Sequence, residues 1–210
     1  MRLRLVGTGV IAALALVGLG ACSTNAGAAA FVDGHRIAEG DVSKYVVPGF
    51  TAPTPSASEQ QFAPPRVLAL DSLIQNRLMA RLLDKSFGGT PSEADLTGLH
   101  DKALATVFGV QQTGAEADAA LTQVLGERGV KASFLPVLLR QAELTMAVID
   151  KIHATQPSDI AAAVNKADIP VSVNARYGSW SKQDAALSGN APLDFLTTGS
   201  SAPASPTPQP

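Results

Sequence analysis

The chain has 210 residues, with 16 basic and 18 acidic side chains and a formal net charge of −2. Its Lys and Arg residues form no cluster that would grip a phosphate backbone, so we do not expect nucleic acid as a partner. A single cysteine excludes an internal disulfide, and aromatic residues make up only 5% of the chain, so packed helices must supply the stability.

Residues 1–21 have the composition of a secretory signal. Arg2 and Arg4 give a positively charged start, and an uncharged run over residues 5–19, rich in Leu, Val and Ala, follows. This run is too short and too interrupted by Gly to span a bilayer, which needs about 20 apolar residues. We therefore expect residues 1–21 to direct export and then to be removed.

The signal ends in Leu19-Gly20-Ala21-Cys22, which resembles a bacterial lipobox. The resemblance predicts a diacylglycerol on the Cys22 sulfur and cleavage between Ala21 and Cys22. An ordinary signal followed by a chance cysteine is the alternative. Because acyl chains bury many CH₂ groups in the membrane, we expect an extracytoplasmic protein that is anchored to the cell membrane by lipid.

After the signal, the sequence predicts a tether at residues 22–28 and a β-hairpin at 29–37. A short helix at 38–47 and a loop at 49–63 should follow. Asp33-Gly34 lies between two short apolar runs and is typical of a two-residue hairpin turn. Val42, Tyr45 and Val46 share one side of the expected helix, and Pro48 should end it.

Apolar residues then recur every three or four positions, which predicts helices over residues 64–85, 90–109, 113–129, 133–152 and 158–166. In the first of these, Asp71, Gln75 and Arg81 fall outside the apolar stripe. Gly88-Gly89 should end that helix, and Thr90-Pro91-Ser92-Glu93 has the pattern of a capping box for the next one.

After Pro170 the apolar residues alternate with polar ones, which predicts a strand over residues 171–176 that continues into a turn at 176–180. We expect this strand to lie beside the hairpin. The fold class is therefore mainly α: one helical domain over residues 29–187, with a small β element from its two ends. Residues 188–210, rich in Ser and Pro, should form a disordered tail.

Several segments together resemble exported foldase chaperones of the SurA and PrsA type, over most of residues 29–180. The segments are Ala30-Phe31-Val32-Asp33-Gly34-His35-Arg36-Ile37 with Asp41-Val42, Leu70-Asp71-Ser72-Leu73-Ile74-Gln75-Asn76-Arg77-Leu78, Leu121-Thr122-Gln123-Val124-Leu125-Gly126 with Gly129, Phe134 and Leu138-Leu139-Arg140, and Asn174-Ala175-Arg176-Tyr177-Gly178-Ser179-Trp180. In related actinobacterial lipoproteins a Pro often precedes the Arg of the last segment, where this chain has Ala175.

The resemblance implies a helical domain that holds unfolded exported polypeptides without nucleotide. Many such proteins also contain a parvulin prolyl-isomerase domain before the closing segment. The interval between His153 and Val171 is too short to fold as a separate domain, so we expect no isomerase activity. A lipoprotein that binds one dedicated cell-envelope partner is the alternative function, and a remnant prolyl isomerase is a weaker one.

The sequence contains no pattern that indicates an active site, a cofactor or a metal centre. His35, His100 and His153 are far apart in sequence and have no ligand spacing, and no G-x-S-x-G motif occurs. We consider Tyr45, Tyr177 and Trp180 as client-contact residues because aromatic side chains suit adaptable apolar binding. The alternative, which we favour, is that they cap the core around the β element.

Overall fold

The computed structural model describes residues 26–51 and 63–188. The expected export signal, Ala21 and Cys22, most of the expected tether, most of the expected loop and all of the expected tail after Ser188 therefore lie outside the described residues. The fold class is confirmed: the described chain is mainly helical, with small antiparallel β elements.

The elements follow in the order β1 (Ala28–Val32), β2 (His35–Ala38), α1 (Glu39–Ser43), α2 (Pro65–Phe87), α3 (Glu93–Gly98), α4 (His100–Phe108), α5 (Gly114–Glu127), α6 (Leu135–Ile152), α7 (Pro157–Lys166), β3 (Val171–Val173), β4 (Ser179–Ser181) and β5 (Ala186–Ser188). Short 3₁₀ turns precede α6 and β4, at Ala132–Phe134 and Ala175–Tyr177.

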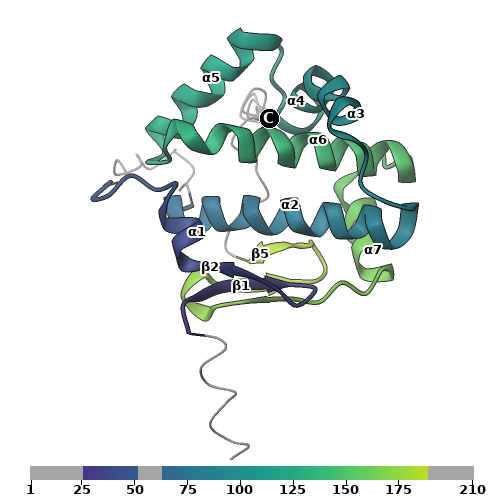
Figure 1. Ribbon diagram of the computed structural model, residues 1–210, viewed down its shortest axis with the longest axis horizontal. Coiled ribbons are helices and arrows are strands. Elements are labelled where there is room, and N and C mark those ends of the chain that lie inside the picture. The colour runs from purple at the N-terminus through teal and green to yellow at the C-terminus, as the bar shows by residue number, and fades with distance from the viewer. Residues whose placement is uncertain (1–25, 52–62, 189–210) are drawn as a thin grey trace, which may run out of the picture.

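The elements form layers in which α2 lies in the middle (Figure 1). The β strands pack under α2, α6 lies along its other side, and α3, α4 and α5 cover α6. Helices α2 and α6 lie side by side and both end at the same end of the molecule, where α7 stands. The apolar core is continuous through these layers.

The expected pairing of the two ends of the domain is confirmed. A three-stranded antiparallel sheet has the order β2-β1-β3, with Phe31 opposite Arg36 on one side and Ser172 on the other. The turn residues Asp33 and Gly34 both have positive φ, 49° and 77°, as a two-residue hairpin turn requires. A hairpin of two strands is marginal in water, so β3 and α2 provide the cover that it needs.

Three predicted details of the helices are wrong. Helix α1 ends at Ser43, because the following residues pair with another loop: Val46 bridges Val130, and the Val47 N–H donates to the Gly129 carbonyl at 2.9 Å. The first cap of the 90–109 segment is Ser92, whose hydroxyl accepts from the Asp95 N–H. That segment also forms two helices, α3 and α4, which are separated at Leu99.

A second hairpin, β4–β5, begins in the predicted turn at 176–180 and continues through residues 181–187, for which the sequence predicted no element. Trp180 lies opposite Leu187, which is buried, and Ser188 is the last residue of β5. The hairpin packs on α2, where the Gln75 side chain donates to the Ala185 carbonyl at 2.8 Å. Three-residue strands carry too little alternation for their pairing to be predicted from the sequence.

Helix α6 and the turn before it, Ala132–Ile152, are long and apolar enough to cross a membrane by length and composition. Among the described residues no other helix has these properties. In the fold this segment is the packed helix between α2 and α4, with Leu138, Ala142 and Val148 buried.

Asp71 is a buried carboxylic acid on α2, although the sequence placed it outside the apolar stripe. Its side chain faces β5, and only 6% of the residue is exposed. Burial raises the pKa of Asp71 from 3.8 to about 6, against hydrogen bonds from the Leu187 backbone and the Gln75 side chain that lower it. One of its oxygens, Oδ1, has no hydrogen-bond partner.

Gly129 and Gly88 provide a matched test of packing against backbone strain. Both have positive φ, 72° and 82°. A Cβ on Gly88 meets nothing within 4 Å, whereas one on Gly129 would lie 2.2 Å from the Phe50 ring. We expect Gly88→Ala to lower the free energy of unfolding by about 1 kcal/mol and Gly129→Ala by about 2–4 kcal/mol, measured by urea denaturation. Equal losses would show that the Phe50 contact contributes nothing.

The raised pKa of Asp71 predicts a pH-dependent stability. Between about pH 4 and pH 6 the folded protein binds more protons at this group than the unfolded chain, so its contribution falls as pH rises, by about 3 kcal/mol in total. Asp71→Asn keeps an oxygen for the Leu187 N–H but cannot ionise. The variant should match the wild type near pH 4 and exceed it by up to about 3 kcal/mol near pH 7, in urea unfolding followed by circular dichroism. A difference independent of pH would contradict this assignment.

Candidate functional site

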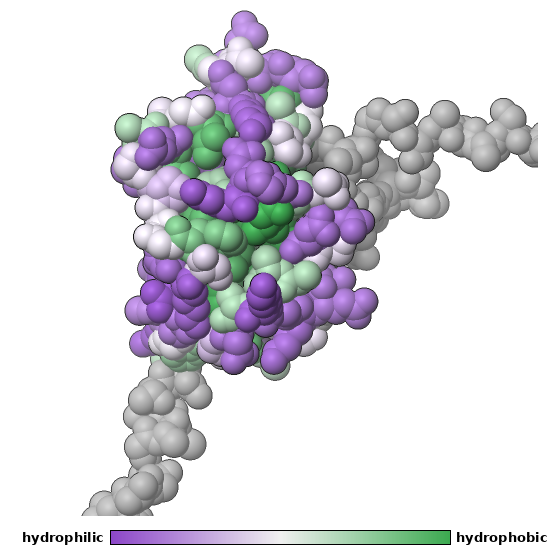
Figure 2. Space-filling view, turned by 90° about the vertical axis from the view of Figure 1, so that its right-hand side faces the viewer, coloured by the Kyte–Doolittle hydropathy of each residue, from purple (hydrophilic) through white to green (hydrophobic). Residues whose placement is uncertain are grey.

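The C-terminal part of α2, the end of α6 and one face of α7 surround an open hollow of about 950 Å³, which we call the α2–α6–α7 hollow. Figure 2 views this end of the molecule, where hydrophobic surface gathers in the middle and hydrophilic side chains surround it. The apolar lining consists of Leu82, Phe87, Ile152, Ala162, Ala163 and Ala167, and the charged or titratable lining of Lys85, Lys151, His153, Asp159 and Lys166.

The hollow exists because two long helices stop at the same level and a helix of small side chains faces them. Helix α2 ends at Gly88 and α6 at His153, both in the left-handed conformation that terminates a helix. Helix α7 presents Ala162 and Ala163 to the hollow. A methyl group fills little volume, so the apolar side chains Phe87 and Ile152 stay partly exposed.

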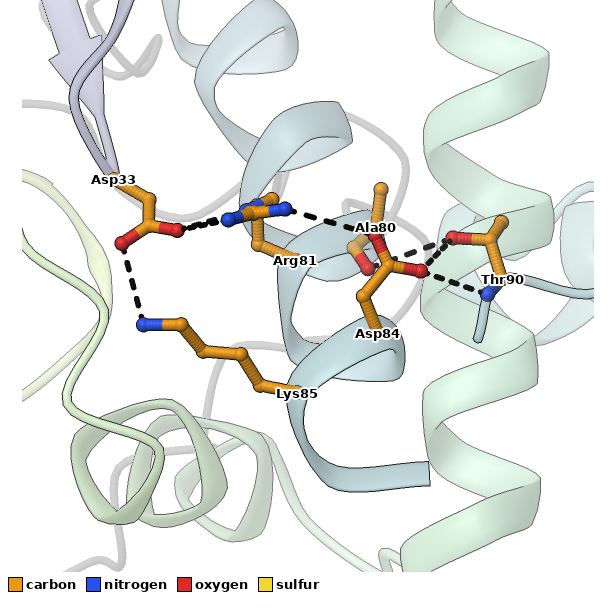
Figure 3. Close-up of polar contacts among 6 residues, drawn as sticks. All are labelled: Asp33, Ala80, Arg81, Asp84, Lys85 and Thr90. Atoms are coloured by element: carbon orange, nitrogen blue, oxygen red, sulfur yellow. Dashed lines mark hydrogen bonds and ion pairs between the residues drawn. The ribbon is translucent and has the colours of Figure 1, made fainter. Parts of the chain in front are cut away.

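Asp33 forms ion pairs with two cations near the hollow, Arg81 and Lys85. The Arg81 Nε donates to this carboxylate at 2.8 Å, and the Lys85 Nζ lies 3.2 Å from its other oxygen (Figure 3). Hydrogen bonds from Arg81 and then from Lys85 hold the pKa of Asp33 below its usual value. On the other side of Arg81, Asp84 accepts hydrogen bonds from the Thr90 backbone and hydroxyl at 2.9 and 3.0 Å. This cluster ties α2 to the β1–β2 turn and to the chain after the helix.

Asp159 is the acidic residue of the lining, and it is engaged with the start of α7. Its carboxylate accepts from the backbone N–H groups of Thr155 and Gln156 at 2.8 and 3.1 Å. These backbone hydrogen bonds, Thr155 first, lower the pKa of Asp159. The negative charge therefore satisfies N–H groups that the helix itself leaves unpaired.

Lys151 and Lys166 are the cations of the hollow that have no carboxylate partner among the described residues. Both are exposed, and each lies in the last turn of its helix. The nearest acidic residue in sequence to Lys151 is Asp150, which pairs instead with Lys102 at 2.8 Å. The hollow thus combines an apolar floor with positive charges that are free to meet a ligand.

The three aromatic residues singled out in the sequence do not line the hollow. Tyr45 packs edge-on against Phe134, with ring centroids 4.9 Å apart. Tyr177 is buried, and its hydroxyl donates to Glu39 at 2.6 Å. Trp180 is half-buried on β4 and packs against the core. The structure therefore places these side chains at separate points around the β elements and α1.

The histidines and acidic side chains of the described residues form no cluster of three that could hold a metal ion. His100 does lie between carboxylates of two neighbouring helices, 3.6 Å from Asp118 and 3.4 Å from Glu143. This arrangement links α4 to α5 and α6. None of these three residues lines the hollow.

Sequence reasoning missed the hollow, although two signals for it were present. Phe87 and Ile152 are large apolar residues at the very ends of helices, where side chains usually meet solvent. Ala161-Ala162-Ala163 is a run of small residues in a short helix. Neither signal indicates a binding surface until the three helices are placed next to one another.

Comparisons with protein-family models, with curated proteins and with solved structures find no match for this chain. The resemblance to the SurA and PrsA type of chaperone therefore remains a prediction from short sequence segments.

Proposed function

We propose that this protein is a lipid-anchored, extracytoplasmic holding protein that reversibly binds extended apolar segments of exported polypeptides. The observation that carries the proposal is the α2–α6–α7 hollow, in which the apolar side chains Phe87 and Ile152 remain partly exposed. A volume of about 950 Å³ lies in the range of sites that bind organic ligands, roughly 300–1,000 Å³.

The expected affinity suits transient holding. Two large apolar side chains of a client would bury on the order of 400 Å², which is worth about 10 kcal/mol at 25 cal/mol per Å². Association costs about 4–15 kcal/mol in lost freedom, so most of that gain is offset. A client segment would therefore bind weakly and leave readily, without a nucleotide cycle.

The proposal includes no chemical step on the client. The hollow presents lysines, a helix-bound carboxylate and a C-terminal histidine at the end of α6, with no nucleophile paired to a base. Binding of an apolar segment needs only that the apolar lining of the hollow can be reached from solvent. Because the interval between His153 and Val171 is too short to fold as a separate isomerase domain, we propose holding without prolyl isomerisation.

A Trp placed in the hollow tests this function. Ala162 is exposed on α7 and lines the hollow, so Ala162→Trp should fill it without disturbing the core. The mature wild-type protein should suppress aggregation of a chemically denatured substrate at near-equal amounts, followed by light scattering, and Ala162→Trp should lose most of that suppression. The control is Ala119→Trp on the exposed face of α5, which should keep it. Failure of the wild type with several substrates would contradict the proposal.

The membrane anchor has a separate test at Cys22. When the protein is produced in a bacterium that processes lipoproteins, an alkyne-labelled fatty acid should be incorporated into the wild type and not into Cys22→Ser, whereas Ser23→Ala should remain labelled. Mass spectrometry should find a diacylated Cys22 as the first residue. A free thiol on Cys22, or a chain that retains residues 1–21, would overturn the anchor.

A further inference from the structure

We infer that the α2–α6–α7 hollow selects apolar polypeptide segments that are flanked by acidic residues. This inference rests on the proposed holding function and adds the class of segment that the site prefers. It follows from the charges around the apolar floor, from the partners that some of them already have, and from the open shape of the site.

The lining of the hollow carries more positive than negative charge. Lys85, Lys151 and Lys166 supply three positive charges and Asp159 one negative charge, whereas the whole chain carries a formal net charge of −2. The hollow is therefore a positive region on a slightly acidic protein. Complementary charge around an apolar contact steers association and discriminates between partners more than it adds affinity.

Some of the charged side chains in the lining already have partners within the described part of the chain, and two lysines do not. Lys85 contacts Asp33, and Asp159 accepts backbone hydrogen bonds at the start of α7. Lys151 and Lys166 have no carboxylate partner among the described residues. Their long aliphatic stems let the ammonium groups reach over an apolar surface while they remain hydrated.

The helix ends around the hollow act in the opposite direction, but they are weaker. The C-terminal ends of α2, α6 and α7 carry partial negative charges of about half an elementary charge each. A lysine lies in the last turn of each of these helices, at Lys85, Lys151 and Lys166. At Lys151 and Lys166, which have no carboxylate partner among the described residues, the full positive charge exceeds the half charge that it faces, so these two positions of the rim stay positive.

The site is shaped so that an extended segment can reach it. The hollow is open at one end of the helical layers, and its floor is seen directly from outside (Figure 2). An extended segment can cross such a floor with its apolar side chains down and its flanking residues over the rim. An Asp or Glu on each flank would then lie within reach of Lys151 and Lys166.

The test compares two labelled peptides with the same apolar centre, one flanked by Glu and one by Lys, by fluorescence anisotropy at low salt. The protein is the mature chain with Cys22→Ser, which is free of lipid. We expect the Glu-flanked peptide to bind about threefold to tenfold more tightly, as two exposed ion pairs allow. Added salt should reduce this ratio because the charges are exposed.

The double variant Lys151→Ala/Lys166→Ala should bring the ratio close to one. Lys44→Ala/Lys131→Ala removes the same charge near α1, where Lys131 donates to the Lys44 carbonyl, and should leave the ratio unchanged. Equal binding of both peptides to the wild type, or an unchanged ratio in the first double variant, would overturn the inference alone. If neither peptide binds, or if Ala162→Trp changes neither affinity, the proposed function fails. Concentration-dependent self-association lost in Ala162→Trp would make a second copy the occupant and overturn both.

Discussion

The burial of α2 between the β strands and α6 is the constraint on which the rest of this fold depends. Neither hairpin has enough apolar surface to be stable alone, and each is fastened to α2 by polar contacts as well as by packing. Arg81 and Lys85 hold the β1–β2 turn through Asp33, and Gln75 holds the β4–β5 turn through the Ala185 carbonyl. On its other side, the Asn76 amide donates to the Val137 carbonyl at the start of α6.

The covered position of α2 buries polar groups, which opposes folding. A helix that is covered on several sides has to bury polar side chains, and Asp71, Ser72 and Asn76 each have a buried oxygen without a hydrogen-bond partner. Burial raises the pKa of Asp71, so its ionised form opposes folding at neutral pH. The continuous apolar core, which extends from the sheet to α4 and α5, offsets these losses.

The same geometry creates the candidate site. Because α2 and α6 end together and α7 turns back across their ends, helix termini converge on one place and leave it partly open. Lysines in the last turns interact favourably with the negative ends of the helix dipoles. Those without a carboxylate partner among the described residues also place positive charge at the opening of the hollow. Under our proposal, the lysines that stabilise single helices also select the ligand once the helices are assembled.

The sequence by itself determined the period of most segments, and hence the long helices, the Asp33-Gly34 hairpin and the strand after Pro170, because these follow from local spacing and turn chemistry. Only the tertiary structure decided which polar residues are buried, that α1 stops at Ser43, and that β4 and β5 pair. It also decided that Phe87, Ile152 and Ala163 meet, since residues far apart in the chain come together only when packing brings their helices side by side. A surface made of three helix ends has no signature in any one of them.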